Sequence, residues 1–140
     1  MSMPQYELHA EPVAVEEAVP VAALRAALRV FLHRSEEAAR EHGLTPRQHL
    51  LLLLIKGAPD HSQQSTVMEL AERMQLAQSS VTELVDRAVA ADLVRRHHSL
   101  ADGRVSYLRL TDTGEERLAA VFTGLAEERQ RLRAAIEQAQ

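Results

Sequence analysis

Apolar residues recur at helical spacing over most of the chain. From Val21 onward they fall three and four positions apart, which is the period of one face of an α-helix. Pro20 suits the first turn of such a helix and Gly43 suits its end. The pattern therefore predicts a helix over about residues 20–42, preceded by an acidic arm, residues 1–19, that has no clear period.

A second helix is predicted from a local capping signal. Thr45–Gln48 combines an N-cap threonine, a proline at the first helical position and a glutamine three residues after the cap. The helix carries the run Leu50–Ile55 and ends near Gly57. Because it is apolar nearly all round, we expect it to be the buried centre of the domain. Residues 57–65 read as a polar loop.

The next segment has the pattern of a helix-turn-helix. Thr66–Glu69 is another capping box, and it opens a short helix that runs to about Met74. Gln75-Leu76 form a tight turn, and a further helix covers about Gln78–Ala91. Two helices that cross over so short a turn need a small residue where they touch, and Ala71 provides it.

Two short alternating segments follow and predict a β-hairpin. Leu93–Arg96 and Val105–Leu110 alternate apolar and polar residues, and Ala101–Arg104 between them contains a turn sequence. Thr111 or Asp112 then caps one long helix that runs to the end of the chain. The predicted fold class is mainly α with one β-hairpin, a winged helix-turn-helix of about residues 44–111 within a single domain of residues 20–140.

The second helix of the helix-turn-helix separates apolar from polar positions. Val81, Leu84 and Val85 share the inner face. The outer positions carry mostly short polar side chains, which can enter a DNA major groove without steric conflict. These positions are Gln78, Ser79, Thr82, Glu83 and Asp86, with Ser80 near the helix start.

Charge distribution strengthens the link to nucleic acid. The net charge is −4, and four glutamates within residues 1–20, which hold no basic residue, account for all of it. Residues 93–109 instead contain four arginines and one aspartate. A locally basic contact surface can therefore exist in a mildly acidic protein.

Individual arginines around the predicted hairpin are candidate DNA contacts. Arg95 and Arg96 lie on its first strand and Arg104 at its tip, from which one arginine can reach the narrow minor groove. Asp102 is placed to hold the guanidinium of Arg104 in one orientation. Arg87 has two alternatives, a structural pair with Asp86 or a hairpin residue, or contact with a phosphate.

Composition excludes several classes of function. The chain of 140 residues has no cysteine, which excludes disulfide scaffolds, cysteine-ligated metals and thiol chemistry. Its longest apolar run is six residues and its start lacks a signal-peptide pattern, so we expect a cytoplasmic protein without membrane contact. No nucleotide-binding or hydrolase motif occurs, which predicts no enzyme and no cofactor. His33, His42 and His49 flank one helix corner, but without ligand spacing we expect no metal site.

Five segments in order resemble the MarR family of bacterial transcription regulators. They are Leu70–Met74, Ser79–Arg87, Leu93–Arg96, Asp102–Arg104 and Leu108–Thr111. The combination is far more specific than any one segment. Three positions depart from the family pattern: Gln75 stands where a turn glycine is usual, Ala77 where a serine N-cap is usual, and Glu83 places an acid on the expected DNA face.

The resemblance implies a homodimer that binds double-stranded DNA at a pseudo-palindromic operator. It implies that helices of about residues 20–42 and 112–139 form the dimer interface and that Arg104 enters the minor groove. The residues that we expect to contact DNA are Gln78, Ser79, Ser80, Thr82, Arg87, Arg95, Arg96 and Arg104.

The resemblance also implies an effector pocket between the dimer interface and the DNA-binding part. We place it near Phe31, Arg34, His49 and Leu53, with Arg34 or His49 available to pair with a small anionic aromatic molecule. Phe31 has an alternative role in the core or the dimer interface. The predicted function is a ligand-responsive repressor. The alternative is a winged-helix protein-interaction module that has lost DNA binding.

Overall fold

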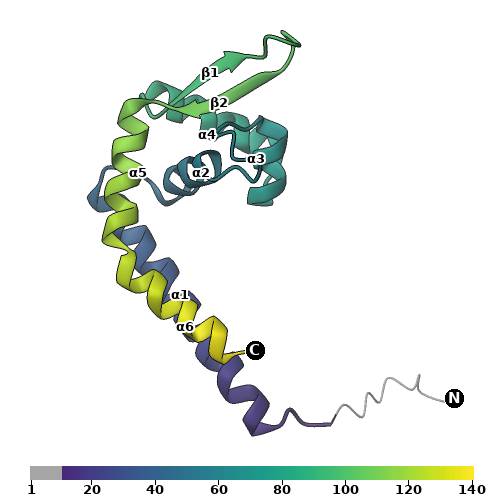
Figure 1. The fold of residues 1–140 in the computed structure, drawn as a ribbon, viewed down its shortest axis with the longest axis vertical. Helices are drawn as coiled ribbons and strands as arrows, with labels where there is room; N and C mark the ends of the chain where they lie inside the picture. The colour runs from purple at the N-terminus through teal and green to yellow at the C-terminus, as the bar shows by residue number, and fades with distance from the viewer. Residues whose placement is uncertain (1–10) are drawn as a thin grey trace, which may run out of the picture.

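The structure is a computed structural model that describes residues 11–140, and it is mainly helical with one antiparallel β-hairpin (Figure 1). In chain order the elements are α1 (Val15–Glu41), α2 (Pro46–Lys56), α3 (Val67–Met74), α4 (Gln78–Ala90), β1 (Val94–His98), β2 (Ser106–Leu110), α5 (Asp112–Gly124) and α6 (Ala126–Gln138). The predicted fold class, a mainly helical winged helix-turn-helix, is confirmed.

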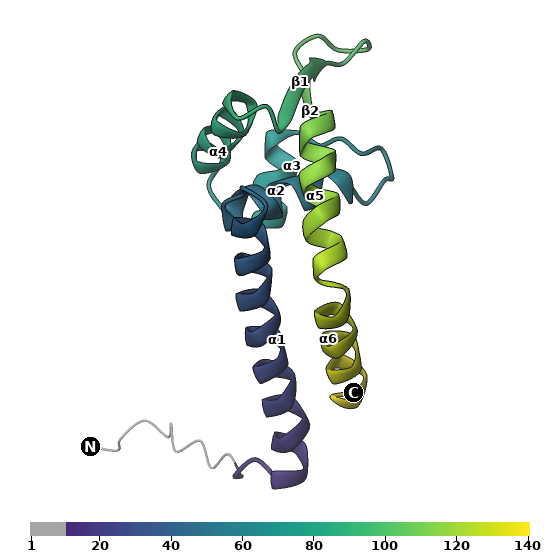
Figure 2. The same ribbon diagram turned by 90° about the vertical axis from the view of Figure 1, so that its left-hand side faces the viewer.

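The molecule has two parts, which Figures 1 and 2 show from two sides. We call α2 to α5 with the hairpin the lobe, and we call α1 and α6, which lie side by side, the stalk. The C-terminal end of α1 reaches the lobe and packs against α2 and α5, while its N-terminal end lies far from it. Within residues 11–140, no helix is both long and apolar enough to cross a bilayer.

Helix α1 begins earlier than the sequence pattern predicted. It starts at Val15, so residues 15–19 are helical and the predicted boundary after residue 19 is wrong. Glu16 and Glu17 lie in the first turn, where carboxylates interact favourably with the helix dipole. Pro20 consequently lies inside the helix and not in its first turn. Residues 1–10 of the predicted arm lie outside the described residues.

Both predicted capping boxes are present. The backbone N–H of Gln48 donates to the Thr45 hydroxyl at 3.1 Å, and the N–H of Thr45 donates to the Gln48 side chain at 3.0 Å. Thr66 and Glu69 form the same reciprocal pair at 3.2 Å in each direction. These bonds satisfy N–H groups that have no partner within the helix, so they define where α2 and α3 begin.

Helix α2 lies at the centre of the lobe, as predicted. Its Leu51, Leu52 and Ile55 side chains have no exposed surface. The other fully enclosed apolar side chains come from α3, α4, the hairpin with Leu93 just before it, α5, and Ala39 near the end of α1. The burial of α2 is not complete, because Leu50 and Leu53 remain 40% and 37% exposed.

The hairpin pairs β1 with β2 in antiparallel register, with Val94 opposite Leu110 and His98 opposite Ser106. The strands cover residues 94–98 and 106–110, where the sequence predicted 93–96 and 105–110. Ser65, at the end of the predicted polar loop, forms a bridge to Leu108 through N–H···O bonds of 3.2 and 2.8 Å. The loop thus adds a short third edge to the hairpin.

The predicted single C-terminal helix is two helices. The backbone of Leu125 (φ −107°, ψ 12°) leaves the helical region between α5 and α6, directly after Gly124, a poor helix former. Leu125 is buried, and the Arg129 side chain donates to the Phe122 carbonyl at 2.6 Å. The break is therefore stabilised by packing and by a side-chain hydrogen bond, neither of which a periodic pattern reveals.

Candidate nucleic-acid interface

The turn between α3 and α4 has the predicted geometry. Gln75 adopts the left-handed conformation (φ 56°, ψ 44°), and its side-chain amide donates to the Glu72 carbonyl at 2.7 Å. The N–H of Leu76 donates to the carbonyl of Ala71, the small residue expected at the crossing, at 3.1 Å. Ala77 is the N-cap of α4 and provides no side-chain cap. The helix-turn-helix therefore forms without the usual glycine and serine.

Helix α4 presents one polar face to solvent. Val81, Val85 and Ala88 are buried against the rest of the lobe. Ser80 is half-buried, so it is the least accessible of the four polar residues predicted to contact DNA at the start of this helix. The exposed positions are Gln78, Ser79, Thr82, Glu83, Asp86 and Arg87.

An ion pair joins the hairpin to α4. The guanidinium of Arg96 on β1 binds the carboxylate of Asp86 on α4. Asp86 therefore pairs with Arg96 and not with Arg87, which corrects one of the two alternatives for Arg87. Arg95 and Arg87 are both exposed. Arg96 was expected to contact DNA directly. In the structure it forms an ion pair with Asp86, which links β1 to α4.

The tip of the hairpin is a hydrogen-bonded turn. The hydroxyl of Ser99 accepts from the N–H groups of Ala101 and Asp102 at 3.2 and 3.3 Å. The Asp102 carboxylate accepts from the N–H of Arg104 at 3.0 Å, and its oxygen lies 3.6 Å from the Arg104 Nε. The Arg104 side chain is 96% exposed. Asp102 thus orients Arg104, as predicted, and leaves it free to bind another molecule.

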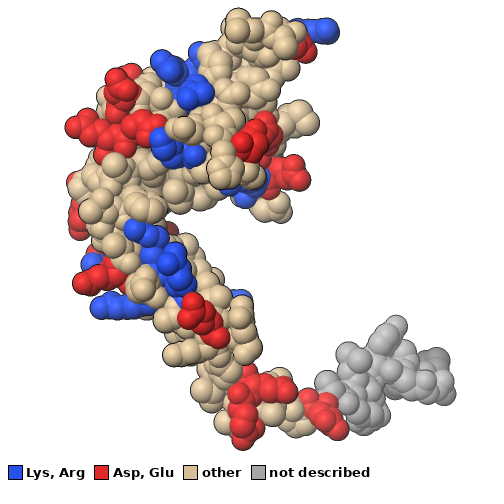
Figure 3. Space-filling view, in the orientation of Figure 1, with Lys and Arg blue, Asp and Glu red and all other residues tan. Residues whose placement is uncertain are grey.

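The outer half of the strand pair is braced from one side. The ring of His97 stacks on Tyr107, with ring centres 5.8 Å apart. The Nε2 atom of His97 lies 2.9 Å from the Gln64 side-chain oxygen. Together with the Ser65 bridge, these contacts tie the hairpin to the loop that precedes α3. Figure 3 shows the hairpin projecting from the lobe, with charged side chains at its outer end.

A cavity of about 310 Å³ lies where α1, α2 and the α5–α6 junction meet. Phe31, His49 and Leu53, three of the four residues predicted for an effector pocket, line it. Arg34 does not. Its guanidinium lies 3.5 Å from carboxylate oxygens of both Glu37 and Glu128, so the predicted role for Arg34 is corrected.

Other residues of the cavity were missed by sequence reasoning. Phe122 and Arg129 line it, and the Arg129 guanidinium lies 3.6 Å from the centre of the Phe122 ring. Arg47 also lines it. Burial lowers the pKa of His49, so the neutral imidazole is favoured there. The basic groups at this cavity are therefore Arg47 of α2 and Arg129 of α6.

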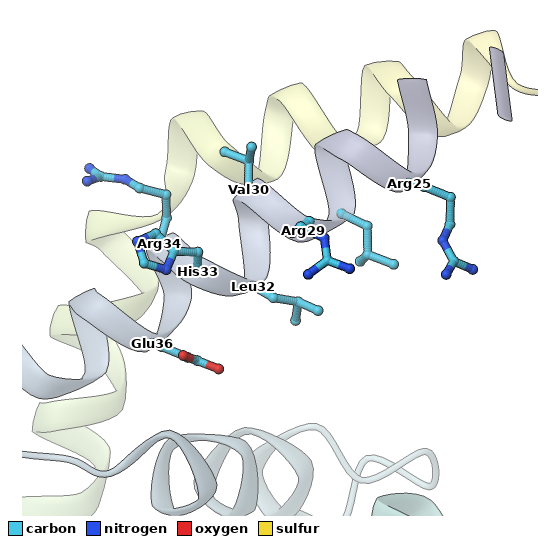
Figure 4. Close-up of a pocket in the computed structure, with 8 residues that line it drawn as sticks. Arg25, Arg29, Val30, Leu32, His33, Arg34 and Glu36 are labelled. Atoms are coloured by element: carbon cyan, nitrogen blue, oxygen red, sulfur yellow. The ribbon is translucent and has the colours of Figure 1, made fainter. Parts of the chain in front are cut away.

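A wider, open groove of about 820 Å³ is lined by α1 alone, and part of it lies on the side of the helix that faces the lobe. Figure 4 shows that Arg25, Arg29 and Leu32 project to this side of the helix. Leu28 and Leu32 are 38% and 52% exposed. His33, one of the three histidines considered for a metal, instead pairs with Glu37 at 2.7 Å. The groove is a mixed apolar and basic surface.

Comparison with known proteins finds similarity to the MarR family. The model of the MarR family matches residues 42–105. The HTH-type transcriptional repressor MdtR of Bacillus subtilis is 36% identical over 88 residues, which cover 63% of this chain. The match spans 54% of MdtR, about half its length.

Solved structures agree on the fold. The YusO protein of Bacillus subtilis is 28% identical, with a TM-score of 0.61 over 85% of this chain and 83% of that one. The MarR C80S mutant of E. coli, solved with operator DNA, has a TM-score of 0.64 at 20% identity, over 86% of this chain and 85% of that one. These likenesses extend over the stalk as well as the lobe.

Proposed function

Because the chain belongs to the MarR family of transcription regulators, we propose that it is a DNA-binding repressor that acts as a homodimer and responds to a small ligand. The observation that carries the proposal is an exposed polar helix face beside a hairpin with an exposed arginine at its tip. The exposed residues of α4 lie beside a hairpin whose tip orients Arg104 outward. MdtR is named a repressor, and the MarR structure holds operator DNA.

We propose that each contact meets a different part of the duplex. Gln78, Ser79 and Thr82 extend from the N-terminal end of α4, the end that enters the major groove in helix-turn-helix proteins. Ser80 is half-buried and contributes its hydroxyl only at the edge of that contact. Arg104 suits the minor groove, whose narrow regions attract arginine.

The other arginines contribute charge and rigidity. Arg87 and Arg95 are exposed on α4 and β1, where each can neutralise a phosphate. Arg96 acts through its ion pair with Asp86, by keeping the strand and the helix in one relative position. Phosphate contacts position the protein on the duplex, and base contacts from α4 provide the sequence preference.

A homodimer explains the exposed apolar surface of the stalk. The exposed large apolar residues of the described chain are concentrated on α1, and Phe122 and Ile136 add to them near α6. Such a surface is characteristic of a protein–protein interface. A twofold dimer would present two copies of α4 to two half-sites, which makes a pseudo-palindromic operator the matching DNA.

The cavity at the α5–α6 junction supports a small anionic aromatic effector. Phe31, Leu53 and Phe122 provide an apolar lining, and Arg129 provides a positive charge. A ligand alters DNA affinity only if it binds one arrangement of the two lobes better than another. The test is a titration of the protein–DNA complex with salicylate. We expect salicylate to release DNA from the wild type and from Arg34→Ala but not from Arg129→Gln, which has lost the positive charge of the cavity.

The proposed function is tested by selecting duplexes from a random 30-base-pair library with the wild-type protein. We expect a pseudo-palindromic sequence and an Arg104→Ala variant that binds it more weakly by about 1–3 kcal/mol with an unchanged melting temperature. Failure of the wild-type protein to enrich any duplex would contradict the proposal. It would favour the alternative, a protein-interaction module.

A further inference from the structure

Leu100 is the most exposed large apolar residue in the described chain, with a relative accessibility of 107%. Single exposed leucines are common on protein surfaces and need no explanation by themselves. Leu100 differs because it lies at the outer end of the hairpin, four residues before Arg104, on a loop whose other large apolar residue, Val105, is half-buried.

The turn fixes Leu100 in this position. Ser99 precedes it and accepts hydrogen bonds from the two residues that follow it, Ala101 and Asp102. The N–H of Ser99 donates to the Val105 carbonyl at 2.9 Å, and the N–H of Val105 donates to the Asp102 carbonyl at 3.0 Å. These bonds order the backbone on both sides of Leu100, and its side chain is fully exposed.

We propose that Leu100 enters the DNA minor groove together with Arg104 and packs against its deoxyribose walls. This inference rests on the proposed function, because it concerns the same contact with DNA. The walls of the minor groove are sugars with apolar C–H surfaces, and proteins that enter this groove combine arginine with apolar side chains. Leu100 and Arg104 thereby divide the contact: one buries apolar surface and the other provides charge.

The two residues leave different thermodynamic signatures. Loss of the Arg104 charge reduces the salt dependence of binding, because fewer counterions are released. Loss of the Leu100 side chain removes buried apolar area, which weakens binding at every salt concentration by the same factor. A reduction of affinity with an unchanged salt slope is therefore specific to an apolar contact.

The test uses a duplex that the wild-type protein selects from the random 30-base-pair library. We expect Leu100→Ala to bind it about tenfold more weakly with the salt slope unchanged, and Leu100→Met to restore most of the affinity. Arg104→Ala provides the contrast, with a lower slope. Hydroxyl-radical footprinting at saturating protein should show protected sugars at the flanks for the wild type and loss of that protection for Leu100→Ala.

The outcomes separate this inference from the function on which it rests. Wild-type affinity and full flank protection in Leu100→Ala would overturn the role of Leu100 and leave the DNA-binding function intact. A weaker Leu100→Ala complex with a reduced salt slope would also overturn it, because the loss would then be electrostatic. If the wild type enriches no duplex, the proposed function fails and the inference falls with it.

Discussion

The lobe and the stalk use apolar residues in opposite ways. In the lobe, Leu51, Leu70 and Val81 are completely enclosed by side chains of the same chain. In the stalk, Leu32 is 52% exposed and Val30 is 56% exposed, although both lie in a long regular helix. The core of the lobe is complete within one chain, whereas the exposed apolar residues of the stalk are the basis of the proposed homodimer.

The two parts also differ in how far apart along the chain their stabilising residues lie. The lobe is built from capping boxes, a tight turn and a hairpin, in which partners are few residues apart. The stalk has no side-chain cap at the start of either α1 or α6. Its helices are held mainly by contact with each other, which explains why its boundaries were harder to predict.

The largest expected effect tests whether the lobe core is closely packed. A Cβ atom at Gly114 would lie 2.1 Å from the carbonyl oxygen of Leu93, so Gly114→Ala must displace backbone. We expect a loss of unfolding free energy of about 3 kcal/mol, at the upper end of overpacking effects. Gly124→Ala in the same helix is the matched control, because nothing lies within 4 Å of its Cβ position. Equal melting temperatures for both variants would contradict the interpretation.

The next largest expected effect is a loss of dimerisation that leaves the lobe folded. Leu28→Glu combined with Leu32→Glu places two carboxylates on the exposed face of α1. We expect dimer dissociation to become at least roughly a hundredfold more favourable, since burying unpaired charge is costly. Met68→Glu is the control, because Met68 is equally apolar and 67% exposed but lies in the lobe. Sedimentation velocity should show monomers for the double variant alone, and a stable wild-type monomer would refute the homodimer.

The contrast between the lobe and the stalk corresponds to which features could be predicted from the sequence. Thr45, Thr66 and Gln75 were assigned correctly, because capping boxes and left-handed turns depend on residues within a few positions. The break at Leu125 was missed, since it depends on packing and on Arg129 reaching back to the Phe122 carbonyl. The predicted role of Arg34 was wrong in part for the same reason: besides the nearby Glu37, it pairs with Glu128, which is 94 positions away in the chain.

His49 offers a pH-dependent test at the boundary between the two parts. Burial holds its pKa below the usual value near 6.5, so the folded protein keeps this imidazole neutral where the unfolded chain binds a proton. The His49 contribution to stability is therefore complete above about pH 6.5 and is lost progressively as the pH falls toward the lowered pKa. Thermal unfolding from pH 7.5 to 5 should show a shallower decline for His49→Gln than for the wild type. Parallel curves would contradict this assignment.

The smallest expected effect concerns the turn of the lobe, where local signals are strongest. Gln75 adopts a left-handed conformation that costs a residue with a Cβ atom about 1 kcal/mol, and its amide offsets part of this cost by donating to the Glu72 carbonyl. Gln75→Ala loses the hydrogen bond and keeps the strain, whereas Gln75→Gly loses the bond and removes the strain. We therefore expect the glycine variant to be more stable than the alanine variant by about 1 kcal/mol in chemical denaturation. If alanine were the more stable of the two, the turn would not be held in the left-handed conformation, and the start of α4 would be set by its packing alone.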